Sequence, residues 1–244
     1  MRSMAVGSVR SRNNVNILGD PSGRPIMFGH GLGSTQHMWR GMTPEFVDHS
    51  VVLFDLTGSG ESDLDAYDSA RYDSPHGHAD ELDLHDVVYV GHSVSAIVGV
   101  LAANREPAPF GALVLVSASP RYLNDVGYAG GFSGCDVERL LDRMDSDFTR
   151  QAAAGHVADT RRHQIERHFA RVALLSDHRR DRGGIVTPTL LVHGTDDPMT
   201  PPAVARYLHA AIPGSTLVVM SASGPSPNPL ASMALAGHIR AYVR

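Results

Sequence analysis

The sequence predicts an α/β protein with a mostly parallel, doubly wound sheet and helices on both of its faces. Short runs of β-branched and apolar residues alternate with segments of helical length, which is typical of βαβ units. The runs are continuously apolar, as expected of strands that helices cover on both sides. With 244 residues, 42% of them hydrophobic, the chain is expected to form one domain over residues 1–244.

Six apolar runs are predicted as strands, and a seventh run, Asn14–Leu18, as an added edge strand. The six strands are expected at Pro25–Phe28, Val51–Asp55, Val87–Val90, Ala112–Val116, Thr189–Val192 and Thr216–Met220. The crossover from the second to the third of these is mostly loop and leaves only about His78–Leu84 for a helix. So short a helix barely covers a sheet face. Either part of the sheet is exposed against another subunit, as in a homo-oligomer, or the loop itself folds over it.

A helical segment interrupts the strand rhythm between Pro120 and Gly184. The residues there are amphipathic and rich in charge, as in "DVERLLDRMDSDFTRQAAAGHVADTRRHQIERHFARVALL". We interpret residues 121–183 as a small helical cap inserted within the domain. It is expected to lie over the carboxyl ends of the strands, where open α/β sheets bind ligands.

Composition excludes several classes of function. The net charge is −5 and the basic residues are scattered, so no nucleic-acid surface is expected. All 21 basic residues are Arg, which excludes Schiff-base chemistry on a lysine and with it the pyridoxal-phosphate class. The N-terminus lacks the apolar run of a signal peptide, and Cys135 has no disulfide partner. We therefore expect a cytoplasmic protein with no membrane association.

The motif Gly91-His92-Ser93-Val94-Ser95 indicates a nucleophile elbow. It follows the strand "DVVYV" and precedes the helical pattern "SAIVGVLAANR", the context in which a tight turn lifts a serine hydroxyl above the sheet. The last position is Ser95, where glycine is usual. Ser93 is thus the candidate nucleophile.

Two further loops match the elbow. His30-Gly31-Leu32-Gly33 follows the strand "PIMF", so the amides of Leu32 and Val94 are predicted to form an oxyanion hole. The loop "GTDDPMTP" after the strand "TLLV" has the spacing of a triad acid, which selects Asp197 over Asp196. The order of serine, then acid, is that of the α/β-hydrolases.

With these residues in place, the chain resembles the α/β-hydrolase superfamily. Within it, the chain is similar to the RsbQ-type stress-signalling hydrolases and to the strigolactone and karrikin receptors of plants. The similarity is carried by "VVLFDLTGSGESDLDAYDSARY", "VGHSVSA", "SPRYLNDVGYAGGF" and "LLSDHRRD". It implies a helical cap over a mostly apolar pocket, and a Ser-His-Asp triad acting on small lipophilic esters, lactones or butenolide-like ligands. By analogy it also implies a signalling partner protein.

The resemblance fails at the general base. In the family, the loop after the strand corresponding to "STLVVM" holds a Gly-His pair, whereas here Gly224 is followed by Pro225. The three prolines of "GPSPNP" favour an extended, stiff backbone. Of the other histidines, His30 is the best candidate for a substitute base, because its loop borders the predicted oxyanion hole. No H-x-x-x-H pair in the cap suggests a metal site, and no cofactor is expected.

Three hypotheses remain open for a small lipophilic ligand. In the first, Ser93, Asp197 and the oxyanion amides polarise a carbonyl group and support cyclisation, elimination or isomerisation, with the triad incomplete. In the second, the protein is a serine ester or lactone hydrolase with a substitute base. In the third, it binds a small molecule without catalysis, as a receptor or stress-signalling protein does.

Overall fold

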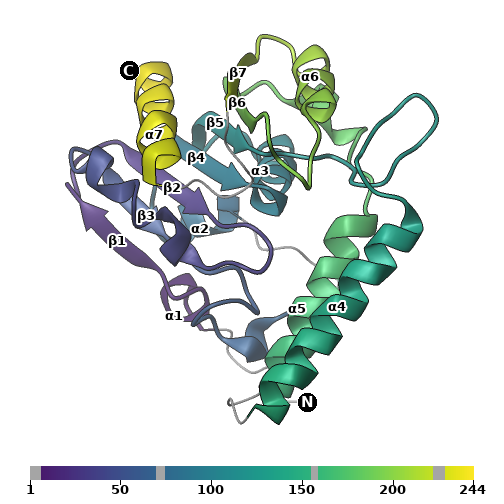
Figure 1. Ribbon diagram of the computed structural model, residues 1–244. Coiled ribbons are helices and arrows are strands. Elements are labelled where there is room, and N and C mark those ends of the chain that lie inside the picture. The colour runs from purple at the N-terminus through teal and green to yellow at the C-terminus, as the bar shows by residue number, and fades with distance from the viewer. Residues whose placement is uncertain (1–6, 70–74, 155–158, 222–228) are drawn as a thin grey trace.

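A computed structural model describes residues 7–69, 75–154, 159–221 and 229–244 of the chain (Figure 1). Within these residues a seven-stranded sheet has the order β1-β3-β2-β4-β5-β6-β7. β1 pairs antiparallel with β3, and every other neighbouring pair of strands is parallel. The predicted fold class, a mostly parallel doubly wound sheet, is confirmed.

The strands lie where the apolar runs predict them. Their bounds are β1 Asn16–Gly19, β2 Pro25–Gly29, β3 Ser50–Leu53, β4 Val87–His92, β5 Phe110–Val116, β6 Thr189–Gly194 and β7 Thr216–Met220. In β3 and β4 every residue is buried, which explains the unbroken apolar runs. β1 is the edge strand, and most of its residues are exposed.

Helices cover both faces of the sheet (Figure 1). Their bounds are α1 Val9–Arg12, α2 Pro75–Glu81, α3 Val94–Arg105, α4 Gly134–Ala153, α5 Thr160–Leu175, α6 Pro202–Ala211 and α7 Pro229–Val243, with short 3-10 turns at Gln36–Trp39, Thr43–Phe46, Leu64–Ala66 and Asp181–Gly184. Alternate strand residues feed two separate clusters. One joins the sheet to α3 and α6, and the other joins it to α7 and to Trp39 and Phe46.

The short crossover helix lies three residues earlier than the sequence predicts. α2 begins at Pro75, a residue suited to a first helical turn, and ends at Glu81. Asp83 then adopts a positive φ of 54°, and the amide of Leu84 donates to the carbonyl oxygen of Ala79 at 2.8 Å, which closes the helix. The ring of His78 on α2 packs edge-on against the ring of Phe54, with centroids 4.8 Å apart, and both side chains are buried.

α4 and α5 lie side by side and extend away from the sheet (Figure 1). Both fall within residues 121–183, for which the sequence predicts a cap. α4 begins with a capping box, in which the Ser133 hydroxyl accepts from the Asp136 amide and the Asp136 carboxylate accepts from the Ser133 amide. A third apolar cluster joins the two helices to the loop after β5, and consists of Tyr122, Val137, Leu141, Ala170 and Leu174. In the described part of the chain no helix is both long enough and apolar enough to span a bilayer.

Candidate active site

Ser93 occupies a strained turn between β4 and α3. Its φ of 55° and ψ of −115° are rare for a residue with a side chain. The Ser93 amide donates to the Val116 carbonyl oxygen at 2.8 Å, which anchors the turn to β5. A Cβ atom on Gly91 would lie 2.6 Å from the carbonyl carbon of Ser95, so only glycine fits where strand and helix approach. This is the geometry that the elbow motif predicts.

The amides of Leu32 and Val94 are the two oxyanion donors that the sequence predicts. Val94 is the first residue of α3, so its amide has no acceptor within the helix. Neither amide donates a hydrogen bond to any residue that the structure describes. A Cβ atom on Gly31 would lie 3.5 Å from the Cβ of Ser93, which places the Leu32 loop directly beside the serine. Two free amides next to a serine hydroxyl are the donors that an oxyanion hole requires.

Ser95, which stands where glycine is usual, has a structural use. Its side chain is fully buried, and its hydroxyl donates to the carbonyl oxygen of His30. The phenolic oxygen of Tyr89 in turn donates to the carbonyl oxygen of Ser95 at 3.1 Å. The extra hydroxyl therefore ties the start of α3 to the loop that carries Leu32.

His30 is fully buried, and main-chain groups engage both of its ring nitrogens. Nε2 accepts from the Leu56 amide at 2.9 Å, which leaves Nδ1 to donate to the Gly31 carbonyl oxygen at 2.9 Å. The ring thus joins the loop after β2 to the loop after β3. This geometry gives His30 a structural role and lends no support to its use as a base for Ser93.

The hydroxyl of Ser93 shares a hydrogen bond of 2.9 Å with the phenolic oxygen of Tyr122. Tyr122 is only 5% exposed and lies in the loop after β5. Tyr122 is not among the site residues that the sequence predicts. The available signal was its position in the loop that follows β5, because the carboxyl end of β5 lies beside that of β4.

An ion-pair network holds the loop that carries Tyr122. The Arg179 guanidinium donates to Asp177 at 2.6 Å and to Asp125 at 2.8 Å, and lies 5.2 Å from the centre of the Tyr128 ring. Arg121 adds a second hydrogen bond to Asp177 at 3.0 Å. Hydrogen bonds from Arg179 hold the pKa of the Asp177 carboxyl well below its usual range. The loop is thereby pinned to the segment after α5.

Asp197 lies in the loop after β6, separated from the Ser93 turn by β5 alone. Its Oδ1 accepts from the amides of Met199 at 2.9 Å and Thr200 at 3.0 Å. Its Oδ2 is buried and has no hydrogen-bond partner among the described residues. Asp196 is exposed, and its carboxylate accepts from the Thr195 hydroxyl. The buried, half-satisfied carboxylate is the one that the spacing selects.

Pro225, the position at which the sequence analysis finds the general base replaced, lies outside the described residues. Within the described ranges, no group of three or more His, Cys, Asp or Glu side chains could hold a metal ion.

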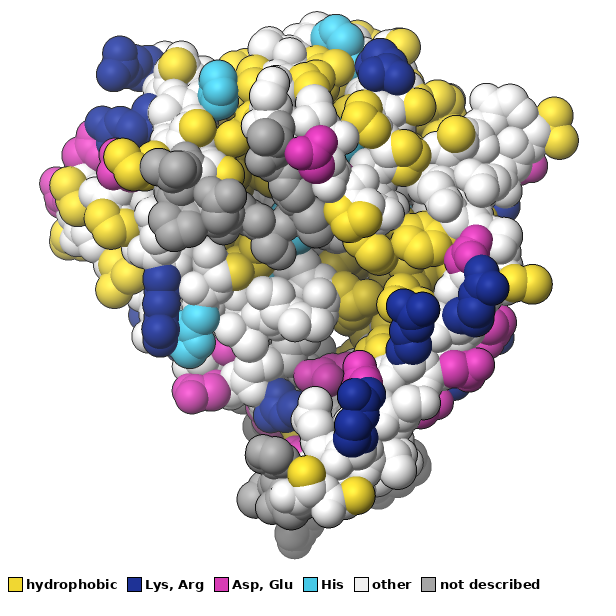
Figure 2. Space-filling model, viewed as in Figure 1, with side chains coloured by type: hydrophobic (Ala, Val, Ile, Leu, Met, Phe, Trp, Pro, Cys, Tyr) yellow, Lys and Arg dark blue, Asp and Glu magenta, His cyan; other side chains and the backbone are white. Residues whose placement is uncertain are grey.

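A narrow cavity of about 10 Å³, room for a single water molecule, lies beside the Ser93 turn. Its lining residues are Val94, Ile97, Val98, Ser119, Tyr122, Ala173, Ser176 and His178. Figure 2 shows a wider hollow between the sheet domain and the α4–α5 pair, with hydrophobic side chains in its walls.

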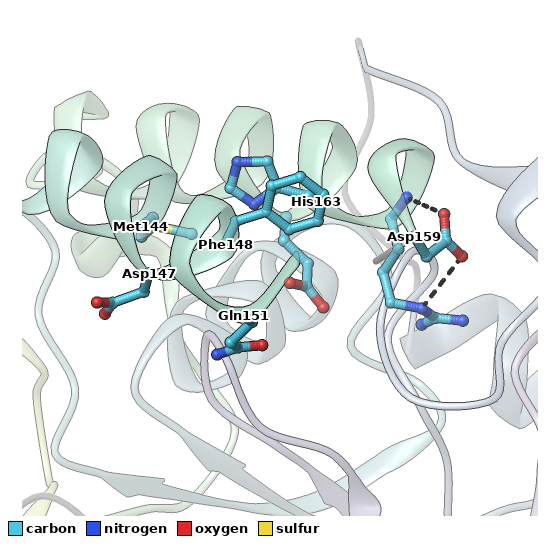
Figure 3. A pocket seen from close by; sticks show the side chains of 8 residues that line it. Met144, Asp147, Phe148, Gln151, Asp159 and His163 are labelled. Atoms are coloured by element: carbon cyan, nitrogen blue, oxygen red, sulfur yellow. Dashed lines mark hydrogen bonds and ion pairs between the residues drawn. The ribbon is translucent and has the colours of Figure 1, made fainter. Parts of the chain in front are cut away.

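A second, roomier pocket of about 450 Å³ lies between the ends of α4 and α5 that are farthest from the sheet (Figure 3). Its lining is mainly polar, and the ring of Phe148 stacks on that of His163 at 4.1 Å. None of the candidate catalytic residues lines it. We therefore place the candidate site at Ser93, where the strained serine lies beside the Leu32 loop and the loop of the buried Asp197 follows the next strand but one.

A parallel sheet with a serine on a strained strand-to-helix turn and an acid after a later strand defines the class of serine hydrolase-like α/β proteins. The model of the alpha/beta hydrolase family matches residues 26–234, and the chain belongs to this family. The resemblance to the strigolactone and karrikin receptors is confirmed by similar proteins.

A karrikin insensitive 2 receptor of Petunia hybrida is 33% identical and covers 91% of this chain and 92% of its own. A strigolactone esterase of Arabidopsis thaliana is 31% identical, and the match covers 93% of this chain and 94% of the relative. Among solved structures, a hydrolase from Oleispira antarctica superposes with a TM-score of 0.81 at 29% identity, with 96% of each chain covered.

Proposed function

We propose that the protein is an enzyme that polarises the carbonyl group of a small lipophilic compound and converts it by non-hydrolytic chemistry, such as cyclisation, elimination or isomerisation. The observation that carries the proposal is the buried Oδ2 of Asp197, which lacks a partner among the described residues. In a complete triad this oxygen would accept a hydrogen bond from the imidazole of the base. The partner of Ser93 is instead a phenol.

The loss of an imidazole impairs nucleophilic attack by the serine but not the polarisation of a carbonyl group. Serine attack needs a proton acceptor, and a triad that lacks one member keeps only about 10³–10⁴-fold acceleration over water. Polarisation of a carbonyl needs only preorganised donors, which the amides of Leu32 and Val94 supply. An enolate formed in the site would hold its negative charge on the oxygen that these amides bind. Asp197 is the carboxylate available to accept the proton from carbon.

The walls of the site favour a small apolar substrate. Val94, Ile97 and Val98 of α3 and Ala173 of α5 form the apolar wall of the cavity beside Ser93, and its polar groups come from Ser119, Tyr122, Ser176 and His178. We propose that residues 121–183 act as the cap that closes over such a ligand. The names of two relatives, both strigolactone esterases, support a ligand that contains an ester carbonyl group.

Restoring the base tests the proposal. Wild-type protein should turn over an activated aryl ester slowly, and Pro225→His should raise that rate by at least about tenfold, since an imidazole is worth about 10²–10⁴ in general base catalysis. Pro227→His, which places the ring two residues further along, is the matched control and should gain nothing. The gain should vanish in Pro225→His/Asp197→Asn and in Pro225→His/Ser93→Ala.

Rapid ester turnover by the wild type that is lost in Ser93→Ala would instead show a working hydrolase. An unchanged rate in Pro225→His would show that more than the base is missing.

A second candidate function is ligand binding without turnover. The similarity to karrikin insensitive 2 receptors favours it, and it implies a signalling partner protein. Measurable affinity for butenolide-type ligands, without conversion of any of them, would support this function over the first.

A further inference from the structure

We infer that Tyr122 is the proton partner of Ser93, in the place that an imidazole takes in a complete triad. This inference deepens the proposed function and rests on it. The two oxygens lie 2.9 Å apart, within the range of a hydroxyl–hydroxyl hydrogen bond. Tyr122 touches the reacting atom itself, and no side chain needs to move for a proton to pass between the two oxygens.

The phenol side of this hydrogen bond is largely buried, whereas Ser93 is partly exposed. The ring is 5% exposed and packs in the apolar cluster with Val137 and Leu141 of α4 and with Ala170 and Leu174 of α5. The Tyr122 carbonyl oxygen accepts from the Phe132 amide at 3.1 Å, so the backbone is held as well. A hydroxyl pair held in a largely buried position interacts more strongly than it would in bulk water.

The direction of proton transfer follows from the state of the phenol. Tyrosine in water ionises at a pH of about 10. A phenol of this ordinary acidity keeps its proton at neutral pH. The two hydroxyl groups can then donate a hydrogen bond to a carbonyl or enolate oxygen, which supports the proposed polarisation. When the phenol is ionised, the phenolate can accept the proton of Ser93 and activate the serine.

A fluorophosphonate probe reports the second state directly. The Ser93 Oγ attacks phosphorus, the Oγ–H bond breaks, and its proton passes to the Tyr122 oxygen. The new O–P bond forms as the P–F bond breaks, and fluoride leaves with the bonding pair. Labelling needs no knowledge of the natural substrate.

Other titratable groups lie near the Ser93–Tyr122 pair and could also shape the pH dependence of labelling. His178 lines the same cavity, and its Nδ1 lies 3.2 Å from Asp181. Arg121 precedes Tyr122 in the loop and is paired with Asp177. The described residues of α4 and α5 in the cluster around the ring are apolar. If a histidine controlled the labelling rate, the rate would change around neutral pH, whereas control by a tyrosine places the change at alkaline pH.

The test is the rate of Ser93 labelling between pH 6 and pH 10.5. Wild type should label slowly at neutral pH and faster through an alkaline midpoint, and Tyr122→Phe should lose that rise, with labelling at high pH slower by about 10²-fold. Tyr242→Phe, which removes a phenol at the far end of α7, should keep the wild-type profile. His178→Gln alters the wall of the cavity and can change the absolute rate, but it should keep the alkaline midpoint of that rate. Replacement of Tyr122 by 3,5-difluorotyrosine, a more acidic phenol that keeps the hydroxyl, should move the midpoint to lower pH.

A profile that survives in Tyr122→Phe, or one with a neutral midpoint that disappears in His178→Gln, overturns the inference. So does an unmoved midpoint with difluorotyrosine, because a purely structural hydroxyl would behave in that way. Tyr122→Phe keeps the ring in its apolar cluster, and an unchanged thermal midpoint verifies its folding. The pH profile of labelling tests only the role of Tyr122. Fast ester turnover by the wild type would contradict only the proposed function.

Discussion

At the scale of single residues, Asp55 shows how one buried charge organises several loops. Its carboxylate is 2% exposed and accepts from the amides of Gln36 at 2.9 Å and Glu61 at 3.0 Å, and from the side chain of Asn14 at 2.9 Å. Gly60 has a φ of +55°, and a Cβ atom there would lie 2.4 Å from this carboxylate. Burial alone would raise the pKa of Asp55, but the hydrogen bonds outweigh burial and lower it.

Asp55→Asn should destabilise the protein by about 2–3 kcal/mol at neutral pH, because an amide nitrogen replaces an oxygen that accepts several hydrogen bonds. Urea denaturation of both proteins measures the difference. Since the folded pKa is lowered, the carboxylate stabilises the fold fully above its unfolded pKa of about 3.9, and this stability is lost as the pH falls through the folded pKa. The difference between the two proteins should therefore shrink below about pH 4. A difference that stays constant there would contradict the assigned hydrogen bonding.

At the scale of elements, the α4–α5 pair is packed unevenly along its length. The buried residues of α4, Val137 and Leu141, both lie in its first half, and those of α5, Ala170, Ala173 and Leu174, lie in its second. These are the two halves nearest the loop that carries Tyr122. The opposite ends meet at the polar pocket around Phe148. Regions with few buried apolar contacts open at a lower free energy than the core.

Leu141→Ala should destabilise the α4–α5 pair selectively, by about 2–4 kcal/mol, because Leu141 is fully buried in the small third cluster. Amide hydrogen exchange measures the effect element by element. Exchange should accelerate across α4 and α5, while the amides of β4 and β5 keep their protection. Equal acceleration in the sheet would show that the helix pair and the sheet unfold as one unit.

At the scale of the whole molecule, the sheet divides the interior into two large apolar clusters. α7 closes one of them at the C-terminal end of the chain, with Leu235, Ala236 and Ile239 packed on the sheet. On the same helix, Met233 is 60% exposed. Substitutions at the buried and the exposed positions can therefore be compared to find how much the packing of α7 stabilises the fold.

Ile239→Ala should lower the free energy of unfolding by about 2–5 kcal/mol, since it leaves a cavity against the sheet. Met233→Ala, at an exposed position of the same helix, is the control and should stay within about 0.5 kcal/mol of the wild type. Urea denaturation monitored by circular dichroism gives both values. Similar small losses in the two variants would mean that α7 contributes little to the core.

Much of the fold could be predicted from local pattern, and so could part of the candidate site. The strands follow from continuous apolar runs, because strands covered on both faces need no polar side. The turn at Ser93 follows from small residues between a strand and a helix. Tyr122 could not be predicted in the same way, since nothing in its local pattern distinguishes it from a packing aromatic. The role of His30 was equally hidden, because it depends on the main chain of Leu56, 26 residues away.

The sequence by itself determined the class of fold, the succession of strands and helices along the chain, and the turn that presents Ser93, because periodicity and turn chemistry are local properties. Only the tertiary structure decided what the serine hydroxyl meets. The phenol of Tyr122 reaches it because β4 and β5 are parallel neighbours whose following loops converge at one edge of the sheet. Likewise, His30 and Ser95 are engaged in joining loops because burial leaves each polar group only the partners that the folded chain brings within reach.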